Sequence, residues 1–217
     1  MGATVHSGKP ARERLLDAAH ELMGTIGLTR ATTKEIARAA HCSEAALYKH
    51  FASKEDLFVR VLAERLPKLS PLLTALTAEP GGRPLEENLT EIARQAALFY
   101  AESFPIAASL YAEPQLKRRH DEAMRELGTG PHLPVEGLDR YLRAERAAGR
   151  LRPDADTFAA ASLLLGACAQ RAFAYDAAAP GDRPPVDDFA RRLARTLLTG
   201  LLAAPEAGTS GVSRPER

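Results

Sequence analysis

Side chains that bind phosphate gather in one short stretch of this 217-residue chain, between residues 32 and 54. Three of the chain's six lysines lie there, among several hydroxyl side chains. Hydroxyls, ammonium groups and the free N–H groups at helix N-termini are common donors to nucleic-acid phosphates. The stretch therefore predicts a nucleic-acid interface. The ten residues expected to contact double-stranded DNA are Thr32, Thr33, Ser43, Glu44, Ala45, Ala46, Tyr48, Lys49, His50 and Lys54.

The expected contacts differ in kind. Lys49 is predicted to reach a guanine edge or a phosphate, and Ala46 to touch a thymine methyl group. Lys54 is predicted to bind phosphate, as are the two threonines at a helix N-terminus. Glu44 is the least favourable member of the set, because a carboxylate repels phosphate. For any one outward side chain, a phosphate contact is commoner than a base contact.

Local signals predict the helices that would present these residues. Thr32 is expected to cap one helix, with Glu35 completing a capping box. Ser43 is expected to cap the next helix, which follows a tight turn. Ser53 is expected to cap the helix that follows, in which Asp56 is the third residue. Two short helices joined by a turn are a device for placing the second helix in the DNA major groove. An apolar stripe also predicts a preceding helix from residue 10, with its C-cap at residue 27.

This pattern resembles the N-terminal DNA-binding domain of the TetR (tetracycline-repressor-like) family of bacterial transcription regulators. The resemblance covers residues 10–66, whereas residues 85–203 are similar to that family only in helix lengths. A bundle whose aromatic side chains merely fill a core is the simpler alternative. The residues that carry the resemblance are Thr32-Thr33 before Ile36-Ala37, then Ala40, Ser43, Leu47-Tyr48, Phe51, and Ser53-Lys54-Glu55 before Leu57-Phe58.

Three positions depart from the family pattern. His41 stands in the turn where glycine is usual, so we expect a histidine in the left-handed conformation, at some cost in strain. Ala45 stands on the reading helix where glycine is common, and its methyl group would alter close contact with DNA. Cys42 replaces a small apolar residue and is expected to pack as one.

The remaining sequence predicts further helices and no strands, so the expected class is all-α. The predicted layout is a flexible arm (1–9), the helix-turn-helix domain (10–66), a connecting segment (67–84), a larger helical domain (85–203) and a disordered tail (204–217). In the larger domain, we expect a helix over 85–103, a short helix that begins at Pro105, and a helix over 114–127. A loop at 128–137 is then followed by a helix that ends at about residue 148. The last two expected helices run over 158–175, with Asp154 as cap, and over 186–203.

The resemblance implies that the larger domain dimerises and binds a small effector. Ser162, Gly166 and Gln170 give one helix a slim face that allows close approach of another helix. Together with the last helix, this face would form a four-helix interface between two subunits. The alternative is that both helices only close the monomer's core. The last helix has its apolar stripe at Phe189, Leu193, Leu197 and Leu201.

Aromatic and methionine side chains of the larger domain suggest a mainly apolar effector held between helices. Each is individually more often a core residue than a pocket residue. The basic run at 117–120 is expected to be a solvated helix face rather than an anion site. The candidate effector-binding residues are Phe99, Tyr100, Phe104, Tyr111, Met124, Tyr141 and Phe173.

Composition narrows the function classes. The net charge is +1, so the overall balance neither supports nor excludes DNA binding. Two distant cysteines and no apolar N-terminal signal region fit a cytoplasmic chain. The apolar helix at 158–175 is a poor membrane span, because Gln170 and Arg171 lie inside it. The sequence shows no phosphate-binding glycine loop, hydrolase elbow or zinc motif, so we expect no enzyme activity, cofactor or metal.

The sequence thus predicts a homodimeric transcriptional repressor that a small effector releases from its DNA operator. Two alternatives remain open. In the first, the protein binds DNA without an effector, and its larger domain only dimerises or binds a protein partner. In the second, the chain is a helical small-molecule binder or enzyme that retains the motif only as fold.

Overall fold

The computed structural model describes residues 8–27, 30–65, 69–112, 114–126, 128–178 and 181–201. Within these ranges the chain is all-α, as predicted, with ten helices and no strand. The predicted tail at 204–217 and most of the predicted arm lie outside them. The helices are α1 (Ala11–Ile26), α2 (Thr33–Ala39), α3 (Glu44–His50), α4 (Lys54–Arg65), α5 (Leu69–Ala78), α6 (Leu85–Ala112), α7 (Pro114–Glu126), α8 (Leu133–Ala147), α9 (Thr157–Ala174) and α10 (Val186–Leu201).

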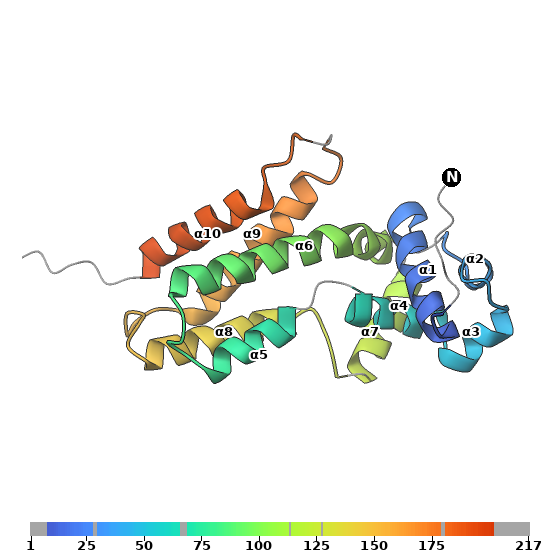
Figure 1. Cartoon of the computed structure of the whole chain (residues 1–217), viewed down its shortest axis with the longest axis horizontal. Helices are drawn as coiled ribbons and strands as arrows, with labels where there is room; N and C mark the ends of the chain where they lie inside the picture. Colours follow the sequence, from blue (N-terminus) through green and yellow to red (C-terminus); the bar gives the residue numbers. More distant parts are fainter. Residues whose placement is uncertain are drawn as a thin grey trace, which may run out of the picture.

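The helices α1 to α4 form a small bundle around its own apolar core (Figure 1). Apolar side chains recur along α1 at helical spacing and bury one face of the helix against α2, α3 and α4. The largest buried side chains of this core are Leu15, Leu16, Met23, Ile36, Leu47, Phe51, Leu57 and Phe58.

The larger bundle has a second core, formed by α5, α6, α8, α9 and α10. Helix α6 runs through it and reaches α1, so one helix spans both bundles (Figure 1). Helix α7 packs on α4 and α6 at the junction between the bundles. An ion pair between Arg119 and Glu55 and a ring contact between Phe58 and His120 link α4 to α7 at this junction.

Four features of the helix layout differ from the predictions. Helix α8 begins at Leu133, inside the loop that was expected at 128–137. Pro105 lies inside α6 instead of opening a short helix. Proline costs a helix one backbone hydrogen bond, and here the 28-residue helix continues through it, packed against neighbours of both bundles. The segment 67–84, expected to connect the domains, contains α5, whose Leu69 and Leu73 are buried in the larger core. Asp156, two residues beyond the expected Asp154, caps α9 by accepting from the N–H of Ala159 at 2.9 Å.

Helix α9 has the length and composition of a membrane span. It packs instead against α6 and α8, and its buried side chains include Arg171 as well as Leu164 and Leu165. A guanidinium group is costly in a lipid bilayer. Within this bundle, Arg171 donates to the carbonyl oxygen of Pro184 at 2.6 Å. One face of α9 is thus packed in the core of the larger bundle.

A network of ion pairs joins α1 to α4. The guanidinium group of Arg12 binds both carboxylate oxygens of Glu64, at 2.9 and 2.6 Å, and this holds the pKa of Glu64 below its ordinary value. A carboxylate with a depressed folded-state pKa stabilises the fold above its unfolded pKa and loses that contribution as pH falls through the folded value. We expect Glu64→Gln to lower the free energy of unfolding by about 0.5 kcal/mol at neutral pH. Urea titrations at pH 7 and pH 3 would measure it, and a cost that persisted at pH 3 would contradict the assignment.

Candidate nucleic-acid interface

Side-chain caps fix the helices of the interface. The Thr32 hydroxyl oxygen accepts from the N–H of Glu35 at 3.2 Å, and the Glu35 carboxylate accepts from the N–H of Thr32 at 3.0 Å. This reciprocal pair is the predicted capping box. Ser43 accepts from the N–H of Ala46 at 3.1 Å at the start of α3, as predicted.

The start of α4 is capped in a similar way. The hydroxyl of Ser53 accepts from the N–H of Asp56 at 3.0 Å. The carboxylate of Asp56 in turn accepts from the N–H of Ala52 at 3.0 Å. These bonds confirm the predicted cap and fix the direction in which α4 leaves α3. Each of the helices α2, α3 and α4 therefore begins at a side-chain cap.

The turn between α2 and α3 contains the expected left-handed residue. His41 has φ of +52°, and it is the one residue other than glycine with positive φ among those described. Cys42 packs, half-buried, against the core of the small bundle, and its sulfur accepts from Arg14 at 3.3 Å. The same arginine donates to the carbonyl oxygen of Ala40 at 3.0 Å. Arg14 of α1 therefore ties the turn to the small bundle.

Helix α3 has one buried face and one exposed face. Leu47 is fully buried, whereas the side chain of Tyr48 is 51% exposed. The exposed face is therefore available for contact with a partner, because the fold does not need it for packing. The other predicted contact residues on this face are exposed, apart from the half-buried Ala46: Ser43, Glu44, Ala45, Lys49 and His50.

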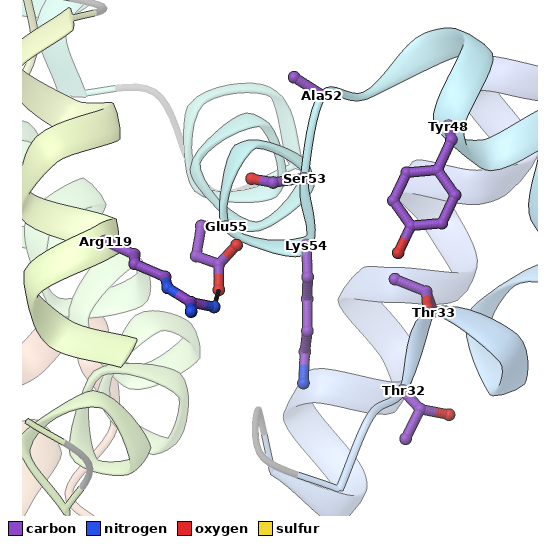
Figure 2. A pocket seen from close by; sticks show the side chains of 8 residues that line it. All are labelled: Thr32, Thr33, Tyr48, Ala52, Ser53, Lys54, Glu55 and Arg119. Atoms are coloured by element: carbon purple, nitrogen blue, oxygen red, sulfur yellow. Dashed lines mark ion pairs between the residues drawn. The ribbon is translucent and has the colours of Figure 1, made fainter. Parts of the chain in front are cut away.

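A hollow lies beside α3, between the N-termini of α2 and α4 (Figure 2). The tyrosine ring and Thr33 stand on one side, and the Lys54 side chain extends between them and the far wall. Four predicted DNA-contact residues, which come from three different helices and a cap, therefore meet at one place. The lining residues are Thr32, Thr33, Tyr48, Ala52, Ser53, Lys54, Glu55 and Arg119.

The threonine hydroxyls of the predicted set are hydrogen-bonded within the fold. The hydroxyl of Thr33 donates to Glu44 at 2.6 Å, and that of Thr32 donates to Glu35 at 2.9 Å. Both hydroxyl hydrogens are thus already engaged within the fold. Glu44, the unfavourable member of the predicted set, has a structural role here: it joins the N-terminus of α3 to the N-terminus of α2. Tyr48, Ser53, Lys54 and Arg119 also bring polar side chains to the hollow.

Four residues of the hollow were not among the predicted contacts: Ala52, Ser53, Glu55 and Arg119. The last two carry opposite charges. Arg119 belongs to α7, within the basic run expected to be a solvated face, and lies 3.5 Å from the carboxylate of Glu55. Glu55 was noted only as part of the family pattern. The two residues are 64 positions apart, and no periodicity or motif in the sequence connects them.

The predicted effector residues do not form one group. Tyr111 is 74% exposed and lies against Lys117, and Phe173 is 68% exposed against the ring of Phe104. Tyr141 is fully buried and its hydroxyl accepts from Asn88 at 2.9 Å. Burial is the main reason that the pKa of Tyr141 lies well above its ordinary value. The remaining members are half-buried: Phe99, Tyr100, Phe104 and Met124.

Helix α9 exposes the slim face predicted for dimerisation. Ser162, Gly166 and Gln170 are exposed, and Leu163 beside them is 65% exposed. In α10, the side chains of Phe189, Leu193 and Leu197 are half-buried and pack against the core of the same subunit. The side chain of Leu201 lies outside the described residues. Leu163 of α9 is therefore more exposed than the half-buried apolar stripe of α10.

Within the described ranges, no three His, Cys, Asp or Glu side chains lie close enough to hold a metal ion.

Burial raises the pKa of the Cys168 thiol to about 12, and the thiol donates to the carbonyl oxygen of Ala93 at 3.4 Å. A thiol is nucleophilic only as thiolate. We expect iodoacetamide at pH 8 to leave Cys168 unmodified in the folded protein and to modify it in urea. Peptide mass spectrometry would measure this, and fast native labelling would contradict the burial.

The fold and the hollow define a protein class: a helix-turn-helix unit joined to a larger helical domain. Residues 15–61 match the family model for bacterial regulatory proteins of the tetR family. The helix-turn-helix part of the chain therefore matches this family. It is 32% identical over 117 residues to the HTH-type transcriptional regulator BetI of Rhizobium meliloti, which covers 54% of this chain and 56% of that protein. The chain covers between 30% and 60% of the length of the curated relatives it matches.

Solved structures share the architecture over most of the chain. The fatty acid degradation regulator FadR from Bacillus halodurans has a TM-score of 0.67 at 18% identity, covering 89% of this chain and 97% of that one. FadR from Bacillus subtilis, in complex with stearoyl-CoA, has a TM-score of 0.64 at 15% identity, covering 87% and 98%. At these identities the similarity shows that the larger helical domain has the same fold.

Proposed function

We propose that this protein is a DNA-binding transcriptional regulator that reads the major groove with α3. The observation that carries the proposal is the position of the hollow beside the exposed face of α3. A helix that enters the major groove passes between two phosphate backbones. Tyr48 and Lys54 at the hollow are placed to contact one of these backbones while Lys49 faces the bases.

The regulator acts as a homodimer in this proposal. The exposed face of α9 supports it, because Leu163 and Phe158 are apolar side chains that the monomer leaves 65% and 53% exposed. Small residues on the same face, Ser162 and Gly166, allow a second helix to approach closely. Two-fold symmetry would present two copies of α3 to successive major grooves, roughly 34–36 Å apart.

A small, mainly apolar effector releases the repressor from its operator in this proposal. The half-buried aromatic residues Phe99, Tyr100 and Phe104 on α6 support an apolar site, and a protein of this fold is seen with stearoyl-CoA. Since α6 spans both bundles, an effector bound along it would favour one placement of the small bundle over another. Release follows when the favoured placement no longer matches the spacing of the grooves.

Gel retardation with DNA from upstream of the protein's own coding sequence tests the proposed function. We expect a specific complex that survives an excess of unrelated duplex at moderate salt. Retardation that the unrelated duplex abolishes equally would contradict the proposal.

Thermal-shift measurements test the effector against the alternative of effector-independent binding. A ligand that binds only the folded state raises its stability by mass action. We expect fatty acyl compounds or other apolar molecules to raise the melting temperature and to dissociate the DNA complex. If compounds stabilise the protein without changing DNA affinity, the larger domain serves dimerisation or a protein partner instead.

A further inference from the structure

The hollow beside α3 contains an acidic side chain in a surface proposed to bind phosphate. Glu55 is the second residue of α4, next to Lys54, and its side chain is 11% exposed. Figure 2 shows its carboxylate directed toward Arg119 at the wall opposite Tyr48 and Thr33, with Lys54 between the two sides. Any phosphate seated at Lys54 would therefore lie close to the charge of Glu55.

That charge opposes DNA binding in two ways. A carboxylate repels the phosphate backbone, which carries about one negative charge per 1.7 Å of duplex. A carboxylate in the first turn of a helix also occupies the positive end of the helix dipole that would otherwise attract a phosphate. Glu55 is thus unfavourable for DNA binding unless a cation balances it.

Arg119 supplies such a cation, and it comes from the larger bundle. Its guanidinium group lies 3.5 Å from the Glu55 carboxylate and its side chain is 68% exposed. The adjacent His120 also packs α7 on α4, because its buried ring contacts Phe58 of the small bundle with ring centroids 5.0 Å apart. The distance between Arg119 and Glu55 consequently depends on how α7 sits on α4.

We propose that Arg119 is a positioning residue for DNA binding, which masks the charge of Glu55 within the phosphate-binding hollow. This inference rests on the proposed DNA-binding function. When α7 is seated on α4, the ion pair cancels the acidic charge and a phosphate can approach Lys54. When α7 moves away, Glu55 is unmasked and repels the phosphate. The ion pair thereby makes DNA affinity depend on the position of α7, although neither of its residues lies on the reading helix α3.

A double-mutant cycle with the full-length protein tests the inference. The probe is a fluorescein-labelled duplex from upstream of the protein's own coding sequence, titrated by anisotropy at low salt. We expect Arg119→Gln to weaken binding about fivefold to tenfold, a loss that shrinks as salt is raised. Glu55→Gln should bind at least as tightly as the wild type. In the Glu55→Gln background, Arg119→Gln should then change affinity by no more than about twofold, because no charge is left to mask.

The control is Arg118→Gln, which removes the same charge from the same helix at an exposed position outside the hollow. We expect a loss of no more than about twofold, and Arg119→Lys should retain most of the wild-type affinity. Equal losses for Arg118→Gln and Arg119→Gln would overturn the masking role. An unchanged penalty for Arg119→Gln in the Glu55→Gln background would also overturn it, and would mean a direct phosphate contact. Failure of the wild type itself to bind would contradict the proposed function instead.

Discussion

Lys54→Ala is expected to weaken DNA binding by about tenfold at low salt. Lys54 is the first residue of α4 and lines the hollow together with Tyr48 and Thr33. When a phosphate contact is lost, fewer counterions are released on DNA binding. The magnitude of the slope of log K against log salt should therefore fall by about 0.9 per contact. In a dimer the change would apply twice. Anisotropy titrations at four salt concentrations would measure both the affinity and the slope.

The matched control for this variant is Arg192→Ala, which removes an exposed cation from α10. This helix belongs to the larger bundle (Figure 1). It removes the same charge without touching the hollow, and its slope should equal that of the wild type. Tyr48→Ala is a second variant of the hollow and should weaken binding with little change of fold, because the ring is 51% exposed. Unchanged affinity in both hollow variants would favour a helical binder or enzyme that keeps the motif as fold alone.

Glu145→Ala is expected to give the largest loss of stability, about 3 kcal/mol in the free energy of unfolding. Glu145 is fully buried on α8, and its carboxylate accepts from Arg150 at 2.5 Å. Arg150 also donates to the carbonyl oxygen of Arg83 at 2.8 Å, so the pair ties the end of α8 to the segment before α6. Removing the carboxylate leaves a largely covered guanidinium group without its anionic partner. Urea unfolding followed by circular dichroism would measure the change.

Glu136→Ala provides the comparison, because it removes an exposed carboxylate from the first turn of the same helix. Its effect should stay within about 0.5 kcal/mol. If Glu145→Ala also fell within that range, the buried ion pair would not stabilise the larger bundle in the way described.

The small bundle could be predicted closely from sequence because its signals are local. The capping box of Thr32 and the caps at Ser43 and Ser53 each depend on residues three positions apart. The left-handed conformation of His41 also follows from its place in a short turn. Such features are decided by backbone geometry within one helical turn, and the structure bears them out.

The differences arise where tertiary contacts override local signals. Pro105 reads locally as a helix breaker, yet α6 continues through it with packing along its length. Asp154 and Asp156 are equally suited to cap α9, and only the path of the chain selects Asp156.

The hollow shows the same limit for the candidate site. Thr33 and Glu44 are 11 positions apart, and Glu55 and Arg119 are 64 apart. No spacing rule joins either pair. The sequence therefore predicted residues that the fold brings to one surface, but not how the hydroxyls and charges of that surface are engaged within the fold.

The most direct test of the central claim is selection of duplexes from a random-sequence DNA pool by the full-length protein. A homodimer that inserts α3 into successive major grooves predicts enrichment of an inverted repeat whose half-site centres lie one helical turn, or a multiple of it, apart. The Lys54→Ala protein should enrich the same sequence more weakly, because a phosphate contact contributes affinity rather than sequence preference. A pool that shows no enriched sequence after selection by the wild-type protein would contradict the account.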